Sequence, residues 1–255
     1  MAKPESTRAT ETLHEIESVF DRSAHWATQN PRLVLGVLGV VLATAAAIGG
    51  TQAWRTRLEG EASAEVASIQ ADYRRAMGAQ PGQGEIPEPA NAEAAAATRG
   101  EYATRLFEAA DRLAGTRAGL SARLQAGTLQ AEVGEAEAAL ATWRQAAEDA
   151  PSGSALAALA QTRLAAGLEA AGDPAAAAEA YLGAGQIEEF PGRVPALGDA
   201  ARCFAQAGQS ERALEVFAGL SEEEVATLPV YVTARLTELR IRARADAPPA
   251  TSEAP

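Results

Sequence analysis

The chain has 255 residues, and its 22 basic and 34 acidic residues give a formal net charge of −12. Phosphate binding needs a net basic face, so this balance argues against a nucleic-acid-binding protein. Aromatic residues make up only 5% of the chain and alanine dominates its hydrophobic fraction, which favours an all-α fold of Ala-rich helices.

Residues 1–32 form an N-terminal segment that is predicted to contain a short amphipathic helix. Thr12 and Glu15 make the T-x-x-E pattern of a capping box, and apolar residues recur after Thr12 at helical spacing. These apolar residues are Leu13, Ile16, Phe20 and Ala24. We expect this helix to lie at a membrane interface or to dock a partner.

Residues 33–54 are predicted to form a transmembrane helix. No charge occurs between Arg32 and Arg55, and a helix over the 21 residues from Leu33 to Ala53 would span about 31 Å, close to the hydrocarbon core of a bilayer. A cleaved signal peptide is the alternative, but the segment before the run is too long and too acidic for one. Small residues four apart in the span predict a face for helix–helix packing. They are Gly39, Ala43 and Ala47.

The remaining ranges follow from composition and periodicity. Residues 55–77 are predicted to continue as a stalk or first helix, and residues 78–92 as a Pro/Gly-rich loop. Residues 93–245 are predicted to hold helical repeats that end in a capping helix, and residues 246–255 a disordered tail.

A pattern of the form Ala-x-x-x-aromatic-x-x-Ala/Leu recurs four times, at intervals of 36, 38 and 36 residues. Its copies are Ala103/Phe107/Ala110, Ala139/Trp143/Ala146, Ala177/Tyr181/Ala184 and Ala213/Phe217/Leu220. A glycine stands five residues before each of the last three copies, at Gly134, Gly172 and Gly208. We therefore predict helical hairpins that bury their faces by stacking, as in a tetratricopeptide-like solenoid.

The first helix of each hairpin is expected to line a concave groove that binds a peptide or a partner protein. The candidate contact residues are Leu124, Thr128, Arg163, Ala166 and Arg202. The carboxylate clamp of tetratricopeptide domains uses Lys and Asn, and neither occurs after Asn91. Hydrophobic or shape-based contact is the expected mode, and a purely structural role for the five residues is the alternative.

The chain shows little that could carry catalysis. Its histidines, His14 and His25, precede the predicted span, whereas its single cysteine, Cys203, follows it. No CxxC, HExxH, P-loop or GxGxxG pattern occurs. The acidic run Glu222 to Glu224 fits a helix N-terminus better than a cation site. We expect a non-enzymatic protein without metal or cofactor.

The order of these elements resembles the YfgM-like family of bacterial inner-membrane proteins, which are associated with the Sec translocon. The resemblance extends from about Leu13 to Ala245 and rests on the amphipathic helix, the span closed by Trp54 and the degenerate repeats. It implies a periplasmic repeat domain whose partners are translocon subunits and a membrane-anchored peptidyl-prolyl isomerase chaperone.

Two other functions stay open from the sequence. One is an envelope assembly or division scaffold with a different client, and the other is a cytoplasm-facing regulatory scaffold. The charges that flank the span do not decide orientation, because Arg22 and Arg32 precede it and Arg55 and Arg57 follow it.

Overall fold

The computed structural model describes residues 29–246 apart from 81, 83 and 84. Every regular element in this part of the chain is a helix, so the predicted all-α fold is confirmed. The predicted amphipathic helix that begins near Leu13 lies outside the described residues, as does the predicted tail from residue 247 onward. The chain divides into two units, Met1–Leu58 and Glu59–Pro255.

In the first unit the structure describes the beginning of α2 (Pro31–Ala76), which covers the predicted span. The large apolar side chains described in this part of α2 are exposed, and those of Leu35 and Val40 are each 67% exposed. The hydroxyl of Thr44 donates to the Val40 carbonyl, at 2.8 Å, so this polar group is satisfied inside the helix as a lipid environment requires. Among the described residues, α2 is the one helix long and apolar enough to cross a membrane.

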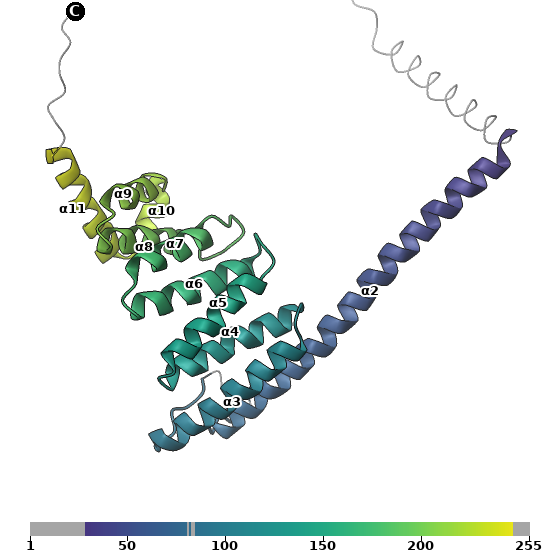
Figure 1. Cartoon of the computed structure of the whole chain (residues 1–255), viewed down its shortest axis with the longest axis horizontal. Helices are drawn as coiled ribbons and strands as arrows, with labels where there is room; N and C mark the ends of the chain where they lie inside the picture. Colours follow the sequence, from purple (N-terminus) through teal and green to yellow (C-terminus); the bar gives the residue numbers. More distant parts are fainter. Residues whose placement is uncertain (1–28, 81, 83–84, 247–255) are drawn as a thin grey trace, which may run out of the picture. The chain divides into compact units, whose positions relative to one another are not determined.

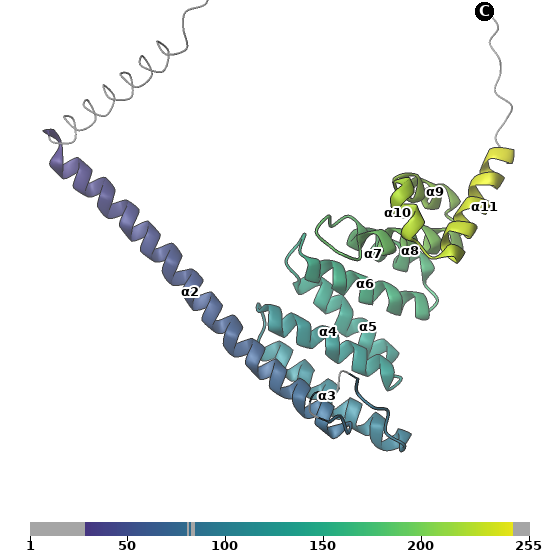
Figure 2. The same cartoon turned by 180° about the vertical axis from the view of Figure 1, so that it is seen from behind.

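The second unit contains the rest of α2 and a stack of helical pairs (Figures 1 and 2). The elements after α2 are α3 (Ala92–Arg112), α4 (Arg117–Glu132), α5 (Ala136–Asp149), α6 (Ala155–Ala170), α7 (Pro174–Gly185), α8 (Arg193–Gln206), α9 (Ser210–Ala218), α10 (Glu222–Thr227) and α11 (Val230–Asp246). Three hairpins, α4–α5, α6–α7 and α8–α9, follow one another in the stack. The tetratricopeptide-like solenoid predicted from the repeats is thus the fold of this unit.

Each hairpin turns at a glycine with a positive φ. The φ values of Gly134, Gly172 and Gly208 are 89°, 82° and 78°, a conformation that a residue with a Cβ adopts only with strain. The amide of the next residue bonds back to a carbonyl five positions earlier, as in a Schellman motif. These bonds are Glu135→Gln130, Asp173→Leu168 and Gln209→Phe204, at 2.9, 2.9 and 2.8 Å.

The recurring alanines and aromatics form the core of the stack. The alanines that open the last three copies of the pattern, Ala139, Ala177 and Ala213, are fully buried. The aromatics in those copies, Trp143, Tyr181 and Phe217, are at most 7% exposed. Small residues where helices cross therefore bring the backbones close together, and the aromatics fill the space toward the neighbouring helices.

Trp143 of α5 shows how tight this packing is. A Cβ added to Gly127 of α4 would lie 2.5 Å from its indole Nε1, and one added to Gly167 of α6 would lie 2.7 Å from its Cζ3. The same Nε1 donates to the Leu124 carbonyl at 3.3 Å. The indole is thus held between the backbones of two first helices.

The last helices close the stack. Ser221 and Glu224 form a capping box at the start of α10, and Glu224 also pairs with Arg193 at the start of α8. α11 packs on α8 and α9 through Val232 and Leu236, which are 1% and 0% exposed. The predicted capping helix is therefore firmly seated on one side.

Candidate functional site

The first helices of successive hairpins lie next to one another and form what we term the first-helix face: α2 from Glu59 onward, α4, α6 and α8. Gln70 of α2 donates to the amide oxygen of Gln125 of α4, at 2.9 Å. Further along the stack, Glu169 of α6 pairs with Arg202 of α8. These contacts join neighbouring first helices.

The five predicted contact residues are placed differently on this face. Arg163 and Ala166 of α6 are exposed, and Thr128 of α4 is half-buried with its hydroxyl donating to the Leu124 carbonyl. Leu124 is 5% exposed and belongs to the core around Trp143. The structure thus brings Arg163 and Ala166 to an accessible surface, whereas Leu124 contributes to packing. Their role in binding stays a prediction.

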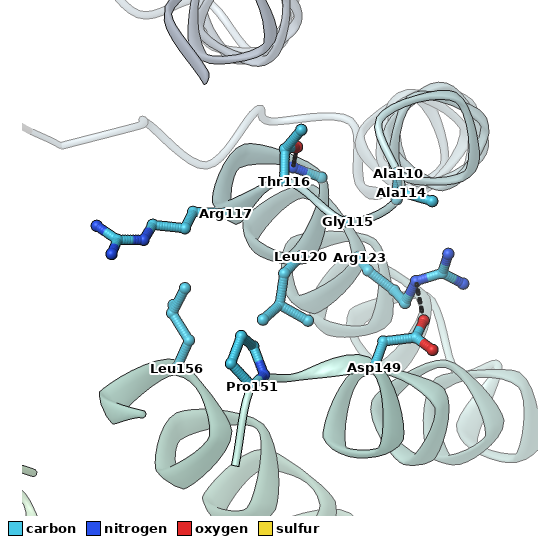
Figure 3. A pocket seen from close by; sticks show the side chains of 11 residues that line it. Ala110, Ala114, Gly115, Thr116, Arg117, Leu120, Arg123, Asp149, Pro151 and Leu156 are labelled. Carbon is cyan, nitrogen blue, oxygen red and sulfur yellow. Dashed lines mark hydrogen bonds and ion pairs between the residues drawn. The ribbon is translucent and has the colours of Figure 1, made fainter. Parts of the chain in front are cut away.

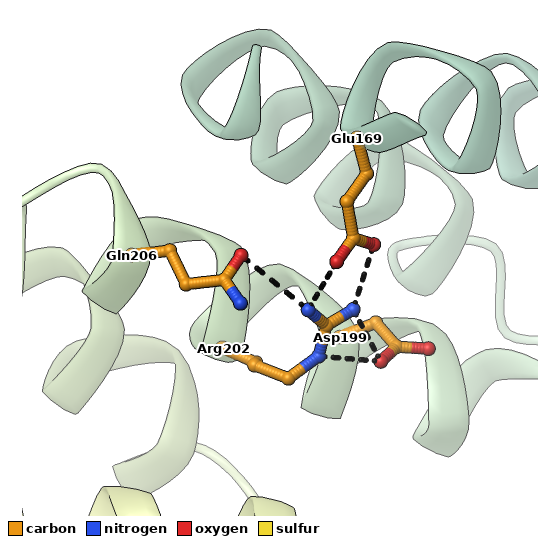
Figure 4. Close-up of polar contacts among 4 residues, drawn as sticks. All are labelled: Glu169, Asp199, Arg202 and Gln206. Carbon is orange, nitrogen blue, oxygen red and sulfur yellow. Dashed lines mark hydrogen bonds and ion pairs between the residues drawn. The ribbon is translucent and has the colours of Figure 1, made fainter. Parts of the chain in front are cut away.

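Arg202 is the centre of a polar cluster (Figure 4). Its Nη1 and Nη2 lie 2.5 and 2.8 Å from the two carboxylate oxygens of Glu169, and Nη2 lies 3.0 Å from Asp199. This hydrogen bonding lowers the pKa of Glu169 and raises that of Arg202. The guanidinium is neutralised by two carboxylates, so it joins α6 to α8 and is not a free cation for a ligand.

Cys203 and Tyr181 lie close to this cluster. Burial, more than any neighbouring charge, raises the pKa of the Cys203 thiol to about 12 and that of the Tyr181 hydroxyl to about 12. Cys203 is also 0% exposed. A thiol that is both inaccessible and protonated is a poor nucleophile, and Cys203 instead belongs to the core around Phe204 and Tyr181.

A small cavity lies beside the turn between α3 and α4 (Figure 3). It has a volume of about 80 Å³ and is lined by Thr116, Leu120, Arg123, Asp149 and Pro151, among others. Arg123 pairs with Asp149 across it, at 3.7 Å. This volume is far below that of a pocket for a drug-sized ligand, so we assign it no ligand.

A larger and more open groove of about 580 Å³ lies over α3, α4 and α5. Its lining includes Phe107, Arg123, Gln130 and Thr142. Arg123 is 8% exposed, its guanidinium lies 5.5 Å from the centre of the Phe107 ring, and it pairs with Asp111 at 2.7 Å. The hydroxyl of Thr142 donates to Gln130. The charge in this groove is therefore already compensated within the chain.

Over the part of the chain that the structure describes, no group of three or more His, Cys, Asp or Glu side chains is placed to hold a metal ion. Glu224, the last residue of the acidic run, accepts from the Ser221 amide, and this bond lowers its pKa. His14 and His25 lie outside the described residues. The acidic run thus serves the capping of α10.

The predicted packing face of the span lies on α2. Gly39, Ala43 and Ala47 are exposed, and a Cβ added to Gly39 would meet no atom within 4 Å. The face is open to a neighbouring helix, and its use in helix packing stays a prediction.

Three contacts of the repeat unit were not predicted from the sequence: Trp143 against Gly127 and Gly167, Gln70 with Gln125, and Glu169 with Arg202. Gly127 and Gly167 could have indicated the contact with Trp143, because a glycine inside a helix often marks a close approach of another element. Glu169 and Arg202 are 33 residues apart, close to one repeat, but many pairs share such a spacing.

Comparison with known proteins gave two results. No protein-family model and no curated protein matches the chain. Two crystal structures of nearly identical TPR-like repeats of a putative kinesin light chain from Podosopora anserina, one of them a variant with a single substitution, are similar to it. Each is 17% identical, aligns over 71% of this chain with a TM-score of 0.48, and is covered to 88% or 89% of its own length.

Proposed function

We propose that the chain is a non-catalytic scaffold that binds other proteins through the first-helix face. The observation that carries this proposal is the face itself: contacts join neighbouring first helices, α2 to α4 and α6 to α8, and Arg163 and Ala166 of α6 are exposed on it. A surface built from successive repeats is extended, which suits a peptide segment or a partner protein better than a small molecule.

The chemistry of the face supports shape-based or hydrogen-bonded contact. Arg202 is occupied by Glu169 and Asp199, so it offers no spare charge to a ligand. The amides of Gln70 and Gln125 pair with each other but keep further donor and acceptor capacity. Such groups match the polar atoms of a peptide main chain.

The proposal also concerns the cellular location of the scaffold and its binding partners. We propose that α2 anchors the scaffold in a bacterial inner membrane and that the repeat unit works in the periplasm near the Sec translocon. There it would hold a peptidyl-prolyl isomerase chaperone or newly exported chains. Support comes from the exposed apolar surface of α2 and from the YfgM-like order of elements.

Site-specific photo-crosslinking in living cells tests this proposal. A photoreactive residue at Arg163, on the first-helix face, is expected to capture translocon subunits and the chaperone. The matched control is the same residue at Arg144, which is exposed on the second helix α5 and should capture neither. Recovery of division or outer-membrane assembly proteins at Arg163, without the translocon, would reject the translocon assignment while keeping the scaffold.

Orientation is tested separately. A reporter that is active only outside the cytoplasm, fused after residue 255, should be active in the full chain. An inactive reporter, together with activity of a cytoplasmic reporter at the same place, would favour the regulatory scaffold that faces the cytoplasm.

A further inference from the structure

The charged side chains that lack an ion-pair partner are divided between the two sets of helices in the stack. Within the described residues of the second helices α3, α5, α7 and α9, six exposed glutamates pair with no cation, against the single unpaired Arg144. They are Glu93, Glu108, Glu137, Glu148, Glu211 and Glu215. On the described first helices α4, α6 and α8, the side chains without a partner of opposite charge are instead two arginines, Arg117 and Arg163.

The acidic side chains of these three first helices are all paired within the part of the chain that the structure describes. Glu132 pairs with Arg99, and Glu169 and Asp199 both pair with Arg202. The acidic side chains of α2 in the second unit also have polar partners. A carboxylate that approaches from solution is therefore attracted to the α4 and α6 part of the first-helix face and repelled by the second helices, although the whole chain has a net charge of −12.

Arg163 lies at the same place in its hairpin as Gln125 and Asp199 do in theirs, nine residues before the turn glycine. In a solenoid such equivalent positions form a row across successive repeats. Gln70 of α2 continues this row, because its amide donates to Gln125 at 2.9 Å. Asp199 accepts from Arg202, whereas Arg163 is exposed and, within the described chain, its guanidinium has no hydrogen-bond or ion-pair partner. A ligand that lies along the row thus meets two amides and then a free guanidinium.

We propose that the first-helix face binds an extended, acidic segment of a partner protein and that an acidic side chain of this segment pairs with Arg163. A guanidinium can hold a carboxylate through two parallel hydrogen bonds. The amides of Gln70 and Gln125 keep donor and acceptor capacity for a main chain. A helical segment fits less well, because its main-chain groups already bond to one another. The inference rests on the proposed function and deepens it by naming the class of segment that binds.

A peptide selection tests the preference for acidic segments. The full chain, in nanodiscs of neutral phosphatidylcholine, selects binders from a display library of random peptides of about 12 residues. Such peptides extend to roughly 40 Å and can cross four helices packed about 9 Å apart. Selected peptides are expected to be enriched in Asp and Glu, whereas non-specific attraction to a chain of net charge −12 would enrich Lys and Arg. The enrichment should disappear with Arg163→Glu and persist with Arg144→Glu, the matched control on α5.

Affinities then assign the contact to Arg163. An acidic peptide from the selection is synthesised with an amidated C-terminus, so that its side chains are the source of carboxylate, together with a copy in which Gln replaces Glu and Asn replaces Asp. The wild type should bind the acidic peptide roughly tenfold more tightly than the copy, and Arg163→Gln should bind the two equally. In the crosslinking test, a photoreactive residue at Ala166, which leaves Arg163 in place, should capture more partner than one at Arg163.

A variant that blocks the face separates this inference from the proposed function. Ala166→Trp puts a bulky side chain at an exposed position of α6 and should weaken both peptides, whereas Ala136→Trp, at an exposed position of α5, should weaken neither. Peptides that Ala166→Trp weakens but that show no acidic preference would overturn the inference and keep the face as a protein-binding surface. Peptides that Ala166→Trp leaves unaffected would overturn both. Binding of phosphatidylglycerol vesicles that depends on Arg163, without selection of acidic peptides, would make a lipid headgroup the occupant and overturn the inference.

Discussion

Gly127 and Gly167 set how closely the backbones of α4 and α6 approach the indole of Trp143. A methyl group at Gly127 would lie 2.5 Å from Nε1 and 2.7 Å from Cδ1 of this buried indole. We predict that Gly127→Ala lowers the free energy of unfolding by about 1–3 kcal/mol, because overpacking outweighs the better helix propensity of alanine. Urea unfolding followed by circular dichroism of the full chain measures it.

Gly100 in α3 provides the control for this prediction. No atom lies within 4 Å of a Cβ added there, so Gly100→Ala should gain up to about 1 kcal/mol from helix propensity. If both variants changed stability in the same direction and by the same amount, close packing at Gly127 would not be the cause.

Glu169 gives the stack a dependence on pH. Its folded pKa is lowered by the hydrogen bonds from Arg202, so the stabilisation is present above its unfolded pKa and is lost as the pH falls through the folded value. Between about pH 5 and 3 the wild type is expected to lose unfolding free energy as Glu169 becomes protonated. We predict that Glu169→Gln removes about 1 kcal/mol of this loss, a small value because the Glu169 side chain is 30% exposed.

Measurement of urea midpoints across this pH range, with Glu148→Gln as the control, tests the assignment. Glu148 is exposed on α5, and its substitution should leave the pH profile as it is. A parallel shift of the whole Glu169→Gln curve, without a change of shape, would mean that proton binding at Glu169 does not contribute.

At the level of elements, the junction between α5 and α6 differs from the other junctions in the stack. Ion pairs join α3 to α4 through Arg99 and Glu132 and α6 to α8 through Glu169 and Arg202. Within the described part of the chain, no side-chain hydrogen bond or ion pair joins the α4–α5 hairpin to the α6–α7 hairpin. Packing around Trp143 holds this junction instead.

We therefore predict that Trp143→Ala loosens the solenoid at this junction before anywhere else. The loss of a buried aromatic should cost about 3–5 kcal/mol. Hydrogen exchange should rise in α5 and α6 more than in α8 and α9, because ion pairs and their own core keep the later helices together.

Phe107→Ala is the matched control, since Phe107 holds the same place in the preceding copy of the pattern but is only partly buried. It should cost less and should leave exchange in α6 unchanged. Uniform acceleration over all helices in Trp143→Ala would show that the stack unfolds as one unit and that the junction is not weaker.

The elements also show how far sequence reasoning reached. The hairpins of the stack were predictable because alanine, aromatic and glycine positions recur with the repeat. The alanines lie where helices cross, the aromatics fill the space toward neighbouring helices, and the glycines form the turns. The lack of polar side-chain contacts between the described parts of the α4–α5 and α6–α7 hairpins was not predictable, since it depends on which side chains of different hairpins meet. The same holds for Leu124: its position on a first helix is readable, but whether it faces the groove or Trp143 depends on helix rotation.

At the scale of the whole molecule, α2 is the described helix that is long and apolar enough to cross a membrane. The large apolar side chains described in its first half are exposed, and Val41 is 57% exposed. We predict that the double variant Val41→Arg, Ala45→Arg releases the chain from membranes. Each arginine at the centre of a spanning helix costs about 2.5–3.5 kcal/mol, and two together shift partitioning by several powers of ten.

Carbonate extraction of cell membranes measures this release. The matched control, Ser63→Arg with Ala64→Arg, adds the same charge to exposed positions of α2 within the second unit and should leave the chain in the membrane fraction. The Glu59–Pro255 unit has its own core, so the released variant should keep its repeat fold and lose only its location. A Val41→Arg, Ala45→Arg chain that stayed in the membrane fraction would show that α2 is not the anchor, because binding through partners should not survive carbonate.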